Sequence, residues 1–288
     1  MKASTAISTE AISLYNNALV FSNRGEYDHA LTEYRKAIAL CPGFVEAYNN
    51  IGEIYSRMGD TSQAITTYQT ALAIERNYKV LLNIGVEYYN KRDYRGALAF
   101  FTESLAKKPD FIEGNFYAGM AHFNMAAYEK AEQFFSRVVQ FDRKHLKANY
   151  LLSYIYYEWK DYGRTLECLD HIRDTADDRV FLNRYYGFCY YHLGRYDDAV
   201  AHLTDALEAC PQYARFKGYL KKLTYENKRK EMGDIDAKIR EMEERMMRDA
   251  PTLSEYTRLS MLYIFQGEYK KAEDLLLAAK GTRGQYPQ

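Results

Sequence analysis

Apolar residues recur at steps of three and four along most of this chain, which is the spacing of one face of an amphipathic helix. The run Tyr48, Ile51 and Tyr55 shows this spacing, and the pattern resumes at Ala64 after a turn around Gly59. Glycine supplies the backbone angles that a helix end requires. The pattern therefore predicts short amphipathic helices that are joined in pairs by tight turns.

A small residue recurs at a nearly constant interval and reveals an internal repeat. Successive members are separated by 34, 33, 34, 34 and 34 residues: Ala30, Ala64, Ala97, Ala131, Thr165 and Ala199. A second, mostly small residue stands twelve positions earlier in each unit: Ala18, Gly52, Gly85, Gly119, Ser153 and Gly187. Because a larger side chain at either place would push two helices apart, each unit is predicted to be an antiparallel helix pair with one close contact.

Two further positions in each unit are aromatic or bulky. In five of the six units a tyrosine stands three residues before the first small residue: Tyr27, Tyr94, Tyr128, Tyr162 and Tyr196. In all six units a bulky residue stands four positions after the first small residue: Tyr34, Tyr68, Phe101, Phe135, Leu169 and Leu203. Proline, which disrupts a helix interior, falls only at unit junctions or in the tail: Pro42, Pro109, Pro211, Pro251 and Pro287.

Together these residues resemble the tetratricopeptide repeat. Six consecutive units resemble it from about Ala11 to Tyr213. A last unit matches again through Ser260, Tyr263, Gly267, Tyr269, Ala272 and Leu276. The resemblance implies an all-α fold, a right-handed superhelical solenoid of antiparallel helix pairs.

The spacing predicts five segments: a tail at 1–10, six tandem repeats at 11–213, an atypical charged helical hairpin at 214–252, a final repeat at 253–284 and a tail at 285–288. In the hairpin, the first helix is strongly basic from Phe216 to Met232. The second carries an apolar seam: Ile235, Ile239, Met242 and Met246. Either the charged face is solvated, or the hairpin forms a basic docking surface or a self-association seam.

Charge and cysteine content narrow the classes of function. Lys and Arg together number 39, as do Asp and Glu, so no global field attracts nucleic acid or an anionic membrane. Cys41, Cys168, Cys189 and Cys210 form no C-x-x-C pair, which favours reduced, buried thiols. No stretch is apolar enough to span a membrane and the N-terminus lacks the apolar core of a secretion signal, so we expect a cytoplasmic location.

No catalytic motif is present in the sequence. It lacks a phosphate-binding glycine loop, H-E-x-x-H, G-x-S-x-G and the calcium-loop spacing. The six histidines are scattered, and His122 and His192 lie near the expected groove edges, where a structural role is favoured. We therefore expect a protein that is not an enzyme and that uses no cofactor and no metal.

In a helical array the first helices of successive units line a concave surface, and the family resemblance implies that this groove holds a partner peptide or an extended partner segment. Three positions per first helix, four and three residues apart, are predicted to face it. In units one to three these include Tyr15, Leu19, Ser22, Glu53, Ser56, Leu82 and Val86. The predicted partner-binding residues are Asn49, Asn83, Tyr89, Phe116, Met120, Phe123, Tyr150, Tyr154, Tyr157, Arg184, Phe188 and Tyr191.

Units four to six place eight aromatic or methionine side chains and one arginine on this face, which suggests a binding site if the side chains are exposed. Two alternatives stay open: these side chains pack against the neighbouring inner helix, or the seventh unit or the tail occupies the groove. Binding of acidic chaperone C-termini, known in one subclass, is not expected. Asn50, Lys79 and Asn83 are compatible with it, but Tyr15 and Leu19 replace the required Lys and Asn of unit one.

The leading hypothesis is a non-catalytic adaptor or scaffold that binds another protein or peptide in the concave groove. A second hypothesis is a structural assembly subunit that self-associates into a homo-oligomer or packs end to end. A third is an RNA-binding or regulatory helical repeat that stacks bases on tyrosines, and the neutral charge balance counts against it.

Overall fold

The computed structural model describes residues 7–210, 214–231, 233–248 and 250–282, and the described residues form sixteen α-helices. The chain divides into two compact units, Met1–Thr175 and Ala176–Gln288. The predicted tail at 285–288 and most of the tail at 1–10 lie outside the described residues. The first helix begins at Thr9, and its N-terminus is capped by the Ser8 side chain.

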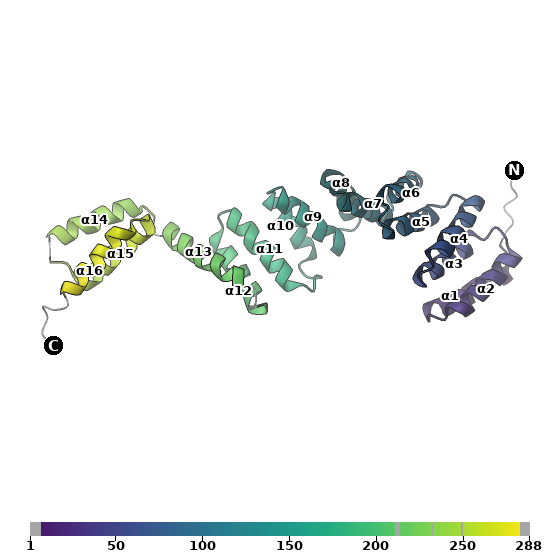
Figure 1. Ribbon diagram of the computed structural model, residues 1–288, viewed down its shortest axis with the longest axis horizontal. Helices are drawn as coiled ribbons and strands as arrows, with labels where there is room; N and C mark the ends of the chain where they lie inside the picture. The colour runs from purple at the N-terminus through teal and green to yellow at the C-terminus, as the bar shows by residue number, and fades with distance from the viewer. Residues whose placement is uncertain (1–6, 211–213, 232, 249, 283–288) are drawn as a thin grey trace. The chain divides into compact units, whose positions relative to one another are not determined.

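The N-terminal unit is built from five consecutive antiparallel helix pairs (Figure 1). They are α1 (Thr9–Asn23) with α2 (Tyr27–Leu40), α3 (Val45–Arg57) with α4 (Thr61–Ile74), α5 (Tyr78–Asn90) with α6 (Tyr94–Lys107), α7 (Ile112–Asn124) with α8 (Tyr128–Phe141), and α9 (Leu146–Glu158) with α10 (Tyr162–Ile172). The second helix of each pair also packs on the first helix of the next pair. The predicted all-α solenoid of stacked helix pairs is confirmed.

Each pair closes around the small residue that the repeat carries at its helix crossing. A Cβ atom at Gly52 would meet the Tyr68 ring, and one at Gly119 would lie 2.7 Å from the Phe135 ring. The bulky partners at this position are at most 1% exposed in all six units: Tyr34, Tyr68, Phe101, Phe135, Leu169 and Leu203. The glycine therefore makes room for a ring that fills the core between the two helices.

The turn inside each pair places one residue in the left-handed backbone region. Gly25, Gly59 and Gly194 occupy this position at φ 76°, 82° and 71°. In the third, fourth and fifth pairs the equivalent residues are Arg92, Ala126 and Lys160, at φ 62°, 57° and 60°. The geometry of the turn is thus kept where the glycine is absent, because packing of the two helices imposes it.

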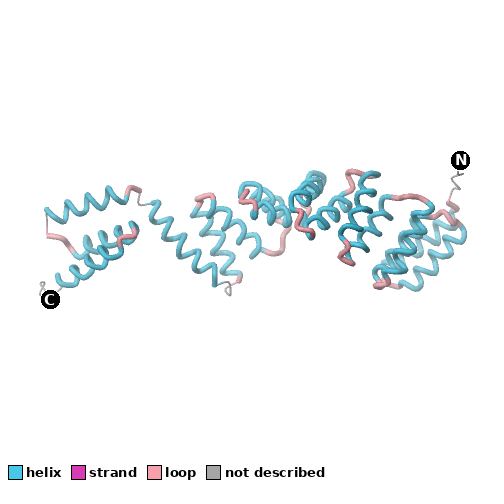
Figure 2. The backbone as a smooth tube through the Cα atoms, turned by 45° about the horizontal axis from the view of Figure 1, so that its top comes forward, coloured by secondary structure: helices cyan, strands magenta, loops and turns pink. Residues whose placement is uncertain are grey.

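The C-terminal unit holds the remaining helices (Figure 2): α11 (Arg179–His192), α12 (Tyr196–Ala209), α13 (Ala214–Glu231), α14 (Ile235–Arg248), α15 (Leu253–Gln266) and α16 (Tyr269–Thr282). The helices α11 and α12 form a sixth pair, and α15 and α16 form another. Among the described residues, α13 packs mainly on α12, whereas α14 packs mainly on α15. The two helices expected to form a hairpin over 214–252 thus each have a different neighbour as their main partner.

The apolar seam of α14 is used inside the C-terminal unit. Ile235 and Ile239 are buried, and Met242 and Met246 pack with them against one face of α15. That face contributes Leu259, Leu262, Tyr263 and Phe265. The seam is therefore occupied by the chain itself, and this removes the sequence argument for a self-association surface along it.

The glycine contact can be tested by adding one methyl group. In Gly85→Ala the new Cβ would overlap the Phe101 ring, which is fully buried. Helix propensity favours alanine by about 1 kcal/mol, but overpacking a core costs about 1–3 kcal/mol. We expect a net loss of about 1 kcal/mol of unfolding free energy, measured by urea denaturation.

Gly218→Ala is the matched control, because Gly218 lies inside α13 and a Cβ there meets no atom within 4 Å. This substitution should stabilise its helix by up to about 1 kcal/mol. Equal gains for both variants would show that the helix crossing has room for a side chain.

Candidate functional site

The first helices of neighbouring pairs form the inner layer of the N-terminal unit. Besides the pairwise packing, α3 contacts α5 and α5 contacts α7 directly. Nine of the twelve predicted partner-binding residues lie on these helices and on α9, and Arg184, Phe188 and Tyr191 lie on α11. Of the twelve predicted partner-binding residues, Asn49 is buried, Tyr154 is exposed, and the other ten are half-buried.

The inner layer is polar where α3 meets α5. The Asn83 amide donates to Asn49 Oδ1 at 2.9 Å and to Glu53 Oε1 at 3.1 Å. The Asn49 amide also donates to Glu53 Oε1, at 2.7 Å. Because these groups satisfy one another, the predicted residues Asn49 and Asn83 act first as a link between two units.

Glu87 extends this polar layer and was missed from the sequence. Its side chain is 3% exposed and accepts a hydrogen bond from the Ser56 hydroxyl. At the same place in other units stand Ile54, Ala121 and Ile155, all of them buried. The sequence held a signal, since Glu87 stands at a repeat position that carries an apolar residue in other units.

A cavity of about 300 Å³ opens beside this polar layer. It lies at the N-terminal ends of α3 and α5 and is lined by Tyr15, Val45, Glu46, Asn49, Asn50, Asn77, Tyr78, Lys79 and Val80. The Asn50 amide donates to the hydroxyls of Tyr15 and Tyr34, at 3.0 Å each. Most of the cavity wall is therefore made of amide, hydroxyl and charged groups.

The inner layer is aromatic over α7 and α9. Phe123 packs edge-on against Tyr154, with ring centroids 5.7 Å apart, and against Tyr128 at 5.4 Å. Tyr154 is 36% exposed, and burial of the remainder raises the pKa of its hydroxyl. Tyr154 on its Phe123 support is thus an aromatic group that a partner can reach.

Other predicted aromatic residues serve the core more than the surface. Phe116 contacts the rings of Phe135 and His145, at 5.9 and 5.1 Å, within a buried cluster. The Tyr89 hydroxyl accepts a hydrogen bond from the Asn124 amide at 2.7 Å, which joins α5 to α7. The interpretation that inner aromatics pack against neighbouring helices therefore holds for part of the set.

The predicted aromatic surface of units four to six is divided between the two compact units. Its first members lie in the N-terminal unit: Phe116, Met120, Phe123, Tyr150, Tyr154 and Tyr157. Arg184, Phe188 and Tyr191 lie on α11, in the C-terminal unit. There the Arg184 guanidinium lies 5.0 Å from the centre of the Tyr185 ring, so this cation already has an aromatic contact.

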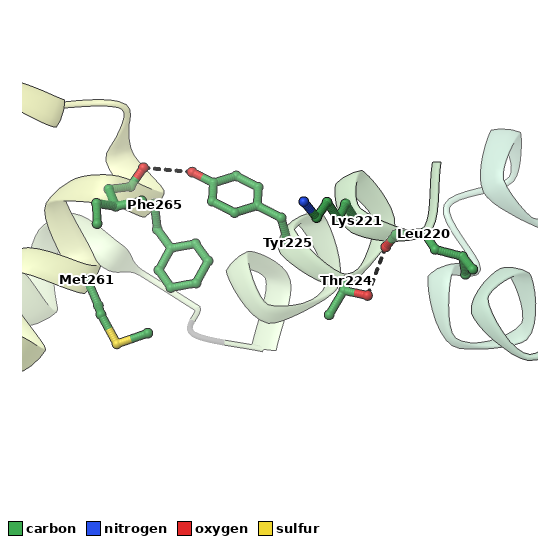
Figure 3. Close-up of a pocket in the computed structure, with 7 residues that line it drawn as sticks. Leu220, Lys221, Thr224, Tyr225, Met261 and Phe265 are labelled. Atoms are coloured by element: carbon green, nitrogen blue, oxygen red, sulfur yellow. Dashed lines mark hydrogen bonds between the residues drawn. The ribbon is translucent and has the colours of Figure 1, made fainter. Parts of the chain in front are cut away.

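A larger cleft, of about 690 Å³, lies between α13 and α15 and was also missed (Figure 3). It is lined by Leu220, Lys221, Thr224 and Tyr225 of α13 and by Met261, Ile264 and Phe265 of α15. In unit six the predicted groove residues Arg184, Phe188 and Tyr191 stand ten, six and three positions before Gly194. The same offsets before Gly267 give Thr257, Met261 and Ile264. Two of these three line the cleft, so the repeat pattern could have located its α15 side.

Comparison with known families identifies the repeats. Profiles described as tetratricopeptide repeats match residues 20–59 and 45–78. A profile of subunit 3 of the anaphase-promoting complex, or cyclosome, matches residues 124–206. The chain is a tetratricopeptide-repeat protein, as its spacing predicted.

Solved structures show the same fold. PilF from Pseudomonas aeruginosa covers 74% of this chain and 97% of its own, with a TM-score of 0.62 and 17% identity. The match to a tetratricopeptide repeat protein from Parabacteroides merdae covers 98% of this chain and 95% of that chain, with a TM-score of 0.51 and 16% identity. The match to the Cut9–Hcn1 complex covers 74% of this chain and 42% of that chain, with a TM-score of 0.52 and 18% identity. No curated protein sequence matches significantly.

Within the part of the chain that the structure describes, no helix is both long and apolar enough to cross a membrane. The same residues contain no cluster of three or more His, Cys, Asp or Glu side chains that could hold a metal ion. Cys41, Cys168 and Cys189 are buried free thiols and Cys210 is half-buried. Burial raises the pKa of the Cys168 thiol to about 12, which keeps it protonated and unreactive at neutral pH.

The Ser56–Glu87 pair allows a test of the polar inner layer. Among the described residues no cation lies within ion-pair distance of Glu87, so its burial is costly. Glu87→Ile, which restores the residue type of Ile54 and Ile155, should raise the unfolding free energy by about 1 kcal/mol or more. Ser56→Ala removes the donor and should lower it by about 1–3 kcal/mol.

Urea denaturation of both single variants and of the double variant measures the coupling between the two side chains. In the Glu87→Ile background the Ser56→Ala change should cost almost nothing, because the carboxylate that needed the donor is gone. Independent, additive effects would contradict this account of the pair.

Proposed function

We propose that this chain is a non-catalytic scaffold that binds a segment of a partner protein on the inner face of α3, α5, α7 and α9. Membership of the tetratricopeptide-repeat family supports a role in protein–protein interaction. The observation that carries the site is Tyr154, whose ring is 36% exposed on an inner helix and supported from behind by Phe123. Tyrosine suits such a position because it offers a large contact area and a hydroxyl with few rotatable bonds.

The polar part of the inner face gives the proposed site a second kind of contact. The cavity beside α3 and α5 presents Lys79, Asn77 and the tyrosine hydroxyls, which can bind backbone or acidic groups of an extended segment. Tyr154 would supply apolar burial and the cavity would supply orientation. Asn49 and Asn83 support this surface by joining α3 to α5.

Capture of partners from a lysate of the source cell, quantified by mass spectrometry, tests the proposal with the intact chain and with Tyr154→Ala. Tyrosine is enriched among the hot-spot residues of interfaces, whose removal costs about 2 kcal/mol or more. We therefore expect at least one partner to be recovered at about tenfold lower yield with the variant. Circular dichroism checks that the variant stays folded.

Phe141→Ala is the matched control, because Phe141 is an aromatic residue that is 53% exposed at the end of the outer helix α8. Its partner set should equal that of the intact chain. If Tyr154→Ala retains every partner, or if Phe141→Ala loses the same one, binding does not use the inner face.

A specific observation favours a second function, assembly through the C-terminal end. Leu276 of α16 is 42% exposed, although its six equivalents, such as Tyr68 and Phe101, are at most 1% exposed. Leu277 beside it is 57% exposed. This apolar face is of the kind that a further helix covers elsewhere in the array, so a subunit could associate there.

Sedimentation velocity over a concentration series tests this second function. If the end associates, the chain should form a multimer that Leu276→Glu dissociates and Tyr154→Ala leaves intact, since a buried carboxylate in the interface would be strongly unfavourable. A monomer at every concentration, or a multimer unaffected by Leu276→Glu, would reject assembly through α16.

A further inference from the structure

The cleft between α13 and α15 lies wholly within the C-terminal unit. Five of its seven lining residues are apolar or aromatic: Leu220, Tyr225, Met261, Ile264 and Phe265. The Thr224 hydroxyl donates to the carbonyl of Leu220 at 2.8 Å, so it is already satisfied by its own helix. The wall of the cleft is therefore suited to an apolar side chain, and its volume of about 690 Å³ is within the range of ligand pockets.

The cleft is held open by the way the helices of this unit pack. The Tyr225 hydroxyl donates to the carbonyl of Ile264 at 2.6 Å, and the Tyr225 ring lies 4.9 Å from the Phe265 ring (Figure 3). These contacts join α13 to α15 at one point. The helix α14 packs on α15 through Ile235 and Ile239, and no residue of α14 lines the cleft.

The charged side chains nearest the cleft are cations. Lys221 lines the cleft itself, and Arg258 lines the next hollow along α15, which shares Met261 with it. Neither side chain has an ionic partner among the described residues. A third hollow also includes Arg258 and Met261, and it has Lys238, Arg245 and one carboxylate, Glu241, on its wall. Arg245 is paired with Glu255 at 3.1 Å.

We propose that this cleft binds an acidic peptide segment of another protein, with one aromatic or branched apolar side chain inserted between α13 and α15. Met261, which is 46% exposed, gains the most from being covered by such an anchor. Aspartate or glutamate residues that flank the anchor pair with Lys221 on one side and with Arg258 on the other. A basic segment is excluded, because it would bring like charges together at the rim.

Selection from a peptide library displayed on phage, with the full chain as bait, tests this proposal. Peptides should be enriched that carry an aromatic or branched residue flanked by two or more acidic residues. By fluorescence anisotropy, synthetic copies should bind Lys221→Glu/Arg258→Glu at least tenfold more weakly than the intact chain. Their affinity for the intact chain should also fall as salt is raised.

Three controls isolate the cleft. Arg240→Glu makes the same change of charge at an exposed residue of α14 that lines none of the three hollows, and it should bind like the intact chain. Tyr154→Ala should also bind normally, because the cleft does not depend on the proposed inner-face site. The affinity of the peptides for Met261→Ser should fall about tenfold. Met247→Ser, which makes the same change at an exposed residue of α14, should bind like the intact chain.

Several outcomes would overturn the proposal. Selection of basic or uncharged peptides, or of none that depend on Lys221 and Arg258, would reject an acidic ligand. Equal binding by the intact chain and by Met261→Ser would place the anchor elsewhere. A dimer in sedimentation velocity that Lys221→Glu/Arg258→Glu dissociates would mean that a second copy of this chain occupies the cleft instead.

Discussion

The close contact between a small residue on one helix and a bulky residue on the next is the constraint on which the rest of the structure depends. At Gly85 the backbone of α5 lies so near the Phe101 ring that a side chain has no space. The contact sets the distance between the two helices of a pair, and the same contact repeats along the array. Because the repeats of the N-terminal unit share this internal spacing, their first helices lie side by side as one layer.

Polar and aromatic residues share this inner layer unequally. Between α3 and α5 the side chains of Asn49, Glu53 and Asn83 bond to one another, and the buried Glu87 relies on Ser56. Ile54 and Ile155 are buried apolar residues at the place equivalent to Glu87, and replacing a buried charged group by an apolar side chain is often neutral or stabilising. Residues that reduce stability without a packing role are commonly kept for binding or for specificity, and this supports a role for the inner face in recognition.

The C-terminal unit departs from the regular stacking, and its candidate site results from that departure. In a regular array the helix that follows α13 would pack along it. Here α14 packs mainly on α15, and Tyr225 is the residue that ties α13 to α15. The space that regular stacking would fill is instead an apolar cleft with Lys221 on its wall. With both proposed sites, the chain would join two partners, one on each compact unit.

The sequence by itself determined the repeat, the helix pairs and the family, because the contact that defines a pair joins residues less than one period apart. Gly52 and Tyr68 lie sixteen positions apart in the chain, so their spacing appears directly as a pattern. Exposure along the inner helices could not be predicted in the same way. Phe116 and Tyr154 fall in one pattern, yet the packing of adjacent units leaves Phe116 half-buried and Tyr154 exposed. The α13–α15 cleft depended on tertiary structure alone, because the 73 residues from Ala199 to Ala272 break the period, and the choice of α14 between two neighbours is decided by apolar burial on α15.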